Sequence, residues 1–113
     1  MMTHSFPKGL HSFNIRIYKI VDDHLLDPII SWSESNNTFI VWDLKWLCKK
    51  ILPKCVGLGR NYPHFFSELQ YRGFERVNGF EQLEFGHENF VRGQPHRLRK
   101  MVLQVWMQMM EKI

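Results

Sequence analysis

Between residues 60 and 77 the hydrophobic positions recur at three- and four-residue steps, which is the period of a helix with one buried face. The positions predicted to be buried are Tyr62, Phe65, Phe66, Leu69 and Gly73. The opposite face is polar and consists of His64, Ser67, Glu68 and Tyr71. Asn61 is a suitable N-cap, and Pro63 fits the first helical turn, where its missing N–H has no partner to lose. The segment is therefore predicted to be an amphipathic helix that presents a polar face.

A similar pattern predicts a helix from about Phe13 to Val21, capped by Ser12. Its buried stripe is Phe13, Ile17, Ile20 and Val21. Residues 1–12 are expected to form a disordered lead-in, and the Asp27-Pro28 pair prevents the helix from continuing.

Two β-branched runs, residues 29–33 and 38–42, flank the polar sequence ESNN and predict a β-hairpin. Each run carries one tryptophan, Trp32 or Trp42. Tryptophans can stack on nucleic-acid bases, but aromatic residues in strands usually pack in the core. We therefore expect both tryptophans to be buried.

Asp43 is predicted to cap a helix from Leu44 to Leu52, which Pro53 ends. The inner face of this helix is expected to be Leu44, Leu47, Cys48, Ile51 and Leu52. After the central helix, residues 74–77 and 81–85 are predicted to form two short strands. They are joined at Asn78-Gly79, a dipeptide typical of tight turns.

The C-terminal stretch, residues 99–113, is predicted to be a helix that is apolar on nearly all sides. A partial heptad seam is formed by Leu98, Val102, Val105 and Met109. The remaining apolar positions are Met101, Leu103, Trp106, Met107, Met110 and Ile113. Such a helix is not stable alone in water. We expect it to pack on the domain, to self-associate with a second copy or to bind a partner protein.

Composition and charge narrow the class of protein. A chain of 113 residues that is 44% hydrophobic and 23% charged is expected to form one folded domain. Its formal net charge is only +4, but five cations and no acidic residue lie between positions 44 and 60. These are Lys45, Lys49, Lys50, Lys54 and Arg60. The basic block suits a polyanionic partner, although a solvated helix face is an equal alternative.

Several kinds of site and segment are not expected. Signal-peptide and membrane-spanning patterns are missing, so we expect a soluble intracellular protein. The two cysteines, Cys48 and Cys55, fit neither CxxC nor zinc-finger spacing and are expected to be free thiols. Because catalytic motifs are also missing, the sequence predicts no enzyme, metal or cofactor.

Four segments together resemble the DNA-binding domain of heat shock transcription factors, particularly the plant type. They are ISWSESNNTFIVWD (30–43), ILPK (51–54), NYPHFFSELQYRGFERV (61–77) and LEFGHENFVRGQ (83–94). The resemblance covers about residues 13–98 and leaves 99–113 as a separate C-terminal helix. It implies an α+β fold, a winged helix-turn-helix with a three-helix core packed on a small antiparallel sheet. It also implies a nuclear transcription factor of the stress response that binds double-stranded DNA.

In that family the central helix reads NFSSFVRQLNxYGF, and its Arg contacts a guanine of a GAA-type element in the major groove. The matching positions are Asn61, Phe65, Leu69, Gly73, Phe74 and Val77, which are chiefly packing positions. The differing positions are Pro63, His64, Ser67, Glu68 and Gln70, with Ser67 in place of the Arg. A forked arginine contributes about 1–3 kcal/mol of base discrimination, and neither Ser67 nor Glu68 can supply it. The family's sequence specificity is therefore in doubt for this chain.

On this basis we name ten candidate DNA-binding residues. Base or groove contacts, or the positioning of the helix that makes them, are expected from Asn61, His64, Ser67, Glu68, Gln70 and Tyr71. Phosphate contacts are expected from Lys54, Arg60, Arg76 and Arg92. The alternative hypothesis is a winged-helix protein-interaction module that has lost DNA readout and docks through its C-terminal helix.

Overall fold

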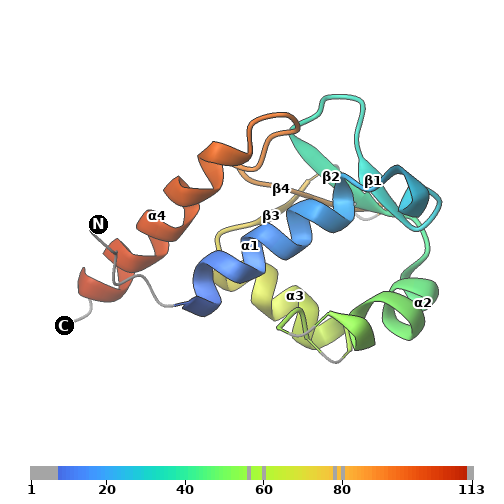
Figure 1. The fold of residues 1–113 in the computed structure, drawn as a ribbon, viewed down its shortest axis with the longest axis horizontal. Coiled ribbons are helices and arrows are strands. Elements are labelled where there is room, and N and C mark those ends of the chain that lie inside the picture. The colour runs from blue at the N-terminus through green and yellow to red at the C-terminus, as the bar shows by residue number, and fades with distance from the viewer. Residues whose placement is uncertain (1–7, 56, 60, 78, 80, 112–113) are drawn as a thin grey trace.

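The computed structural model describes residues 8–55, 57–59, 61–77, 79 and 81–111 of the chain. Its sheet has four antiparallel strands in the order β1-β2-β4-β3. The strands are β1 (Ile30–Trp32), β2 (Thr38–Val41), β3 (Glu75–Val77) and β4 (Leu83–Gly86). Helix α1 (Lys8–Val21) lies against this sheet, and α3 (Tyr62–Tyr71) lies below it in Figure 1. Helix α4 (Leu98–Glu111) contacts α1 and extends away from the sheet at the left of the view (Figure 1). The predicted α+β arrangement is confirmed.

Strand register places an aromatic cluster at the centre of the domain. Phe39 on β2 lies opposite Phe85 on β4, and both rings are buried. The Phe39 ring lies 5.6–5.7 Å from the rings of Phe74, Phe85 and Phe90. Gly86 lies beside Thr38, where a Cβ atom would come within 2.7 Å of the threonine methyl group. The sheet therefore tolerates only glycine at that point without movement.

Helix α1 begins at Lys8 rather than at Phe13, so the prediction that residues 8–12 belong to a disordered lead-in is wrong. Ser12 lies inside the helix and is not its cap. A serine is tolerated there because its hydroxyl can bond to a carbonyl of the preceding turn. Residues 1–7 lie outside the described part of the chain. The predicted buried stripe is confirmed at all four positions, Phe13, Ile17, Ile20 and Val21.

Trp32 is buried as predicted, but Trp42 is 53% exposed, so its placement in the core was wrong. Strand β2 ends at Val41, and Trp42 lies in the bend that leads to the next helix. The indole Nε1–H of Trp42 donates to Ser31 Oγ at 2.9 Å. That hydrogen bond holds the ring against the outer side of the β1–β2 hairpin, where solvent reaches it.

The lysine-bearing helix is capped by Asp43, whose Oδ1 accepts from Trp46 N at 3.0 Å. It is less regular than predicted, because α2 (Leu44–Trp46) continues as a π-helical segment, η2 (Leu47–Ile51), and a 3-10 turn, η3 (Leu52–Lys54). Pro53 has no N–H to donate, and its ring would clash with the preceding turn of a regular α-helix. A wider turn followed by a tighter one accommodates the proline.

Strands β3 and β4 form the wing. Both strands are shorter than predicted, and the connection between them is longer. Strand β3 ends at Val77 and β4 begins at Leu83, so residues 78–82 separate the two strands and the connection is not a two-residue turn. Asn78, half of the predicted turn dipeptide, lies outside the described residues. The pairing of β4 with β2, which sets Phe85 opposite Phe39, fixes the β4 register independently of the turn.

Helix α4 packs on the domain through Leu98, Met101, Val102 and Val105, which are all buried. Of the three alternatives expected for the C-terminal helix, this confirms the first, that it packs on the domain. Met109, predicted to continue the seam, is instead largely exposed at the edge of the packed face. Among the described residues, none of the helices is both long and apolar enough to cross a membrane.

Replacing Leu69 by alanine tests how strongly α3 is packed. Leu69 is fully buried, so Leu69→Ala should lower the free energy of unfolding by about 2–5 kcal/mol. Chemical denaturation followed by tryptophan fluorescence measures this change. Leu25→Ala removes a leucine that is almost fully exposed and should leave the midpoint unchanged. Equal midpoints for the parent and Leu69→Ala would contradict the packing of α3.

Candidate nucleic-acid interface

Helix α3 is fixed at both ends by backbone and side-chain hydrogen bonds. At its start, Asn61 Oδ1 accepts from His64 N at 3.0 Å, so Asn61 is the N-cap that the sequence predicted. At its end, Gly73 has a φ of +92°, a conformation that favours glycine. The N–H of Phe74 donates to the carbonyl of Leu69 at 3.0 Å across this turn. The helix is therefore held rigidly relative to the sheet that follows it.

The inner side of α3 packs against the aromatic cluster. Phe65 and Leu69 are fully buried, and the Phe66 ring lies 5.3 Å from that of Phe85 on β4. Tyr62 was predicted to be buried but is half-exposed; it lies in the first turn, where its ring is 5.5 Å from that of Phe66. Gly73, also predicted to be buried, is exposed and lies beyond the end of α3, whereas burial of Phe65 and Leu69 is as predicted.

The outer side of α3 is centred on Ser67. His64, Gln70 and Tyr71 surround it, and all four side chains are exposed. The segment Tyr62–Tyr71 contains no lysine or arginine. This surface can accept and donate single hydrogen bonds, but it has no planar, forked donor. It can lie against a polar partner without bringing positive charge of its own.

Glu68 does not belong to the outer surface as predicted, because its carboxylate pairs with Arg72. Arg72 Nη1 lies 2.6 Å from Glu68 Oε1, and its guanidinium carbon lies 4.0 Å from the centre of the Phe13 ring on α1. Only 7% of Arg72 is exposed, and this burial lowers the pKa of its guanidinium, an effect that Glu68 opposes. His64 Nε2 lies 3.9 Å from the other oxygen of Glu68.

The ion pair of Glu68 and Arg72 couples α3 to α1, because Arg72 also packs on Phe13. This pair was not predicted from the sequence. The available signal was the four-residue spacing of Glu68 and Arg72, which places opposite charges on one side of a helix.

Positive charge lies on both sides of α3. Lys45, Lys49, Lys50 and Lys54 are exposed along α2, η2 and η3, which confirms that these lysines face outward. Arg76 is exposed on β3, and its Nη2 donates to the carbonyl of Gln82 at 3.3 Å. Arg76 and Gln70 line one hollow of about 550 Å³ between α3 and the wing. Arg60 lies outside the described residues, so its place is not assigned.

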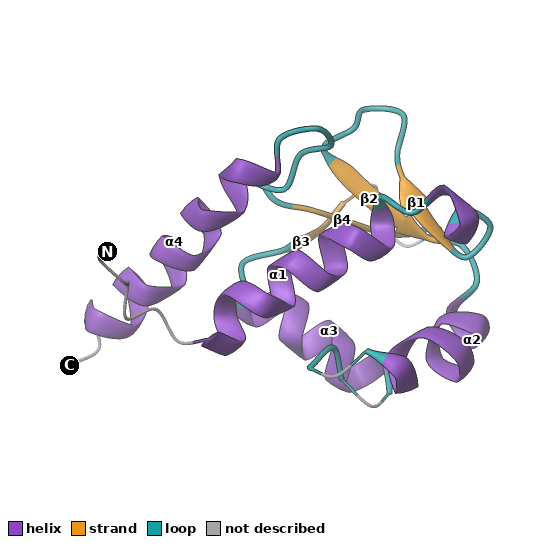
Figure 2. Cartoon of the chain, in the orientation of Figure 1, coloured by secondary structure: helices purple, strands orange, loops and turns teal. Residues whose placement is uncertain are grey.

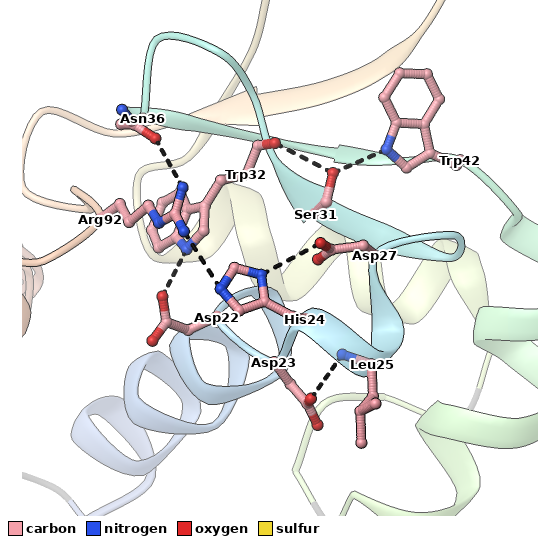
Figure 3. Close-up of polar contacts among 10 residues, drawn as sticks. All are labelled: Asp22, Asp23, His24, Leu25, Asp27, Ser31, Trp32, Asn36, Trp42 and Arg92. Carbon is pink, nitrogen blue, oxygen red and sulfur yellow. Dashed lines mark hydrogen bonds and ion pairs between the residues drawn. The ribbon is translucent and has the colours of Figure 1, made fainter.

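The guanidinium of Arg92 points toward Asn36 and His24 (Figure 3). Its Nη1 lies 3.4 Å from Asn36 Oδ1, and its Nη2 lies 3.4 Å from His24 Nε2. Its backbone N–H also donates to the carbonyl of Asn36 at 2.9 Å. These contacts join the loop after β4 to the β1–β2 turn, which lies across the sheet from α3 (Figure 2). Arg92 thus links the loop after β4 to the β1–β2 turn and does not adjoin the outer side of α3.

The two cysteines are free thiols, as predicted, and both are half-buried. Burial raises the pKa of both thiols, so they remain protonated at neutral pH. Cys48 packs beside the backbone of Tyr62 at the start of α3. Its role is therefore packing between η2 and α3.

Known proteins resemble this chain over most of its length. Heat stress transcription factor A-4a of Arabidopsis thaliana is 38% identical over 91 residues, covering 80% of this chain and 22% of the relative. Heat shock factor protein HSF8 of Solanum lycopersicum is 40% identical over 87 residues, covering 77% and 16%. The chain thus spans about a fifth of the length of these relatives. The name of the first relative describes a transcription factor.

Solved structures show the same fold. Chaetomium thermophilum Skn7 with SSRE DNA superposes with a TM-score of 0.72 at 25% identity, covering 79% of this chain and 95% of that one. The same protein with HSE DNA gives a TM-score of 0.70 at 27% identity, covering 78% and 95%. The HSF-type DNA-binding profile matches residues 13–104. The winged helix-turn-helix fold is confirmed, and the chain belongs to the HSF-type DNA-binding family.

Proposed function

We propose that this domain binds double-stranded DNA in the nucleus, as the DNA-binding part of a transcription factor of the heat shock factor type. The observation that carries the proposal is the position of α3. Its polar outer side lies between the lysines that precede it and Arg76 on the wing. A helix flanked by cations on both sides matches a major groove flanked by two phosphate backbones. Skn7, whose fold is similar, was solved with SSRE DNA and with HSE DNA.

Phosphate contact and groove contact come from different elements in this arrangement. Lys54 and Arg76, with the exposed lysines of α2 and η2, contact phosphates, and Arg60 in the sequence before α3 is a further candidate. His64, Ser67, Gln70 and Tyr71 face the groove. Asn61 acts by capping the helix, and Arg92 acts by bracing the β1–β2 turn. Affinity therefore derives chiefly from charge, and the groove contacts add little base preference.

A protein-interaction module is the second candidate function. It is favoured by the missing forked donor on α3 and by the apolar outer side of α4. The two functions separate at low salt, where a DNA-binding domain with this cationic surface must bind duplex DNA and a pure interaction module need not.

The first prediction from this proposal concerns the effect of salt concentration on binding to DNA. Binding to a random duplex should weaken as salt rises, because each phosphate contact contributes about −0.9 to the slope of log K against log salt. Lys54→Gln combined with Arg76→Gln should reduce the magnitude of that slope by about two. Fluorescence anisotropy titrations at several salt concentrations measure it. Lys19→Gln removes an exposed lysine from α1, away from the α3 surface, and should leave the slope unchanged.

Two outcomes would count against this proposal in different ways. A strong preference for inverted GAA repeats over scrambled duplex would show that α3 reads bases without a forked donor. Failure to bind any duplex at low salt would exclude the DNA-binding function and favour the interaction module.

The second prediction restores readout at Ser67, the central exposed position of α3. Ser67→Arg should add about 1–3 kcal/mol of preference for a GAA-containing half-site, the value of one bidentate contact to guanine. Ser67→Lys is the matched control, because it adds the same charge without the fork and should tighten binding to all duplexes alike. The measurement is the ratio of affinities for the GAA duplex and a base-substituted duplex at one salt concentration. An unchanged ratio for Ser67→Arg would mean that α3 does not dock in the major groove as in the family.

The third prediction concerns the contribution of the Glu68–Arg72 pair to stability. It is also the reason why Ser67→Arg is tested with Glu68 unchanged. Glu68→Gln leaves the buried guanidinium of Arg72 without its carboxylate and should lower stability by about 1–3 kcal/mol, since Glu68 itself is partly exposed. Thermal unfolding measures the loss. Glu34→Gln changes an exposed carboxylate in the β1–β2 turn and should have little effect. Equal unfolding temperatures for Glu68→Gln and the parent would show that the pair does not support the fold.

A further inference from the structure

Helix α4 has a second apolar surface that the domain does not cover. Its inner side holds the buried residues Leu98, Met101, Val102 and Val105. On the opposite side, Leu103, Met107 and Met110 are 43%, 60% and 55% exposed. These three positions follow steps of four and three residues, so they form one continuous outer stripe. Three large apolar side chains aligned on a solvated helix face indicate a contact surface.

Charges at the two ends of this stripe indicate what covers it. Lys100 lies one turn before Leu103, and Glu111 lies one turn after Met107. Both are exposed, and both lie on the same edge of the stripe, because eleven residues bring an α-helix round by almost three whole turns. The stripe therefore carries a positive charge at its first end and a negative charge at its last.

We propose that α4 pairs with α4 of a second copy of this chain in an antiparallel arrangement. A two-fold axis that crosses the outer stripe at the level of Val105 then places Leu103 of each copy against Met107 of the other. The same axis places Lys100 of each copy beside Glu111 of the other. Because the contact is isologous, each of these pairings occurs twice. In a parallel pair the two-fold axis runs along the helices and places the charged edges of the two copies on opposite sides of the contact, so neither charge gains a partner. Charge therefore favours the antiparallel pair.

The pair is weak by this geometry. One outer stripe of a 14-residue helix buries less than the roughly 1,200 Å² of total area found in stable complexes. The methionines suit such a contact, because their unbranched side chains adapt to an opposing surface. None of the pairing residues lies on α3, although Met107 and Glu111 line one hollow with Gln70 and Tyr71 of that helix. The proposal goes beyond DNA binding and does not depend on it.

The test is the self-association of the full chain without DNA. Sedimentation velocity from about 5 to 500 µM at low salt should show a reversible monomer–dimer equilibrium. Leu103→Glu combined with Met107→Glu should leave the protein folded, by thermal unfolding, but monomeric throughout. Leu25→Glu places the same charge on an exposed leucine of η1 (His24–Leu26) and should dimerise like the parent. A parent that stays monomeric, or a double variant that still dimerises, would overturn the proposal.

Charge exchange tests the orientation. Lys100→Glu and Glu111→Lys should each weaken the dimer about tenfold at low salt, because each sets like charges together at both ends. Combining the two substitutions restores opposite charges in the antiparallel pair and should restore the parent affinity. Mixing the two single variants should give a heterodimer tighter than either homodimer. If the combined variant dimerises no better than the single ones, the antiparallel register is wrong. Monomers at every concentration would leave the stripe to a partner protein.

Discussion

The packing of α3 against the Phe39 cluster is the constraint on which the rest of the domain depends. Phe39 is held between β1 and β4 by the sheet register, and its ring contacts Phe74, which follows directly after the turn at Gly73. The Phe74 ring also lies 5.0 Å from that of Phe90, beyond β4. The end of α3, the centre of the sheet and the loop that leads to α4 therefore all contribute a ring to the same aromatic cluster. Because Phe65 and Leu69 face the same core, the direction of the outer side of α3 is fixed as well.

The arginine that directly follows α3, Arg72, packs in that core. Arg72 lies over the Phe13 ring and pairs with Glu68, so it joins α1 to α3 instead of facing outward. A buried guanidinium is stable only with its carboxylate, which in turn removes Glu68 from the outer surface. The cations that remain exposed lie on the neighbouring elements. Positive charge and polar side chains consequently lie on different elements. The exposed lysines and Arg76 on the neighbouring elements carry the charge, and α3 presents the polar surface.

Periodicity predicted the elements that are buried on one side, and it failed where a tertiary partner decides. The stripes of α1 and α3 follow from spacing alone, since buried apolar positions repeat with the helix. Trp42 could not be placed, because a hydrogen bond to Ser31, eleven residues away, sets its orientation. The same holds for Arg92, whose partners lie in the β1–β2 turn and η1. The family resemblance supplied the fold, but the internal partners of Glu68 and Arg92 are invisible in a single sequence.

Weak readout and weak self-pairing, the two properties proposed above, would together have a physical consequence. A domain that binds mainly through phosphates gains little from a single site, because neighbouring duplex offers almost the same contacts. Two such domains joined through α4 hold their α3 helices at a fixed separation. The second then binds at the effective concentration set by the first. Selectivity would arise from the spacing of two tolerant contacts on DNA rather than from the bases beneath either one. On a winged-helix scaffold without a forked donor in α3, geometry between domains can thus replace chemistry within one.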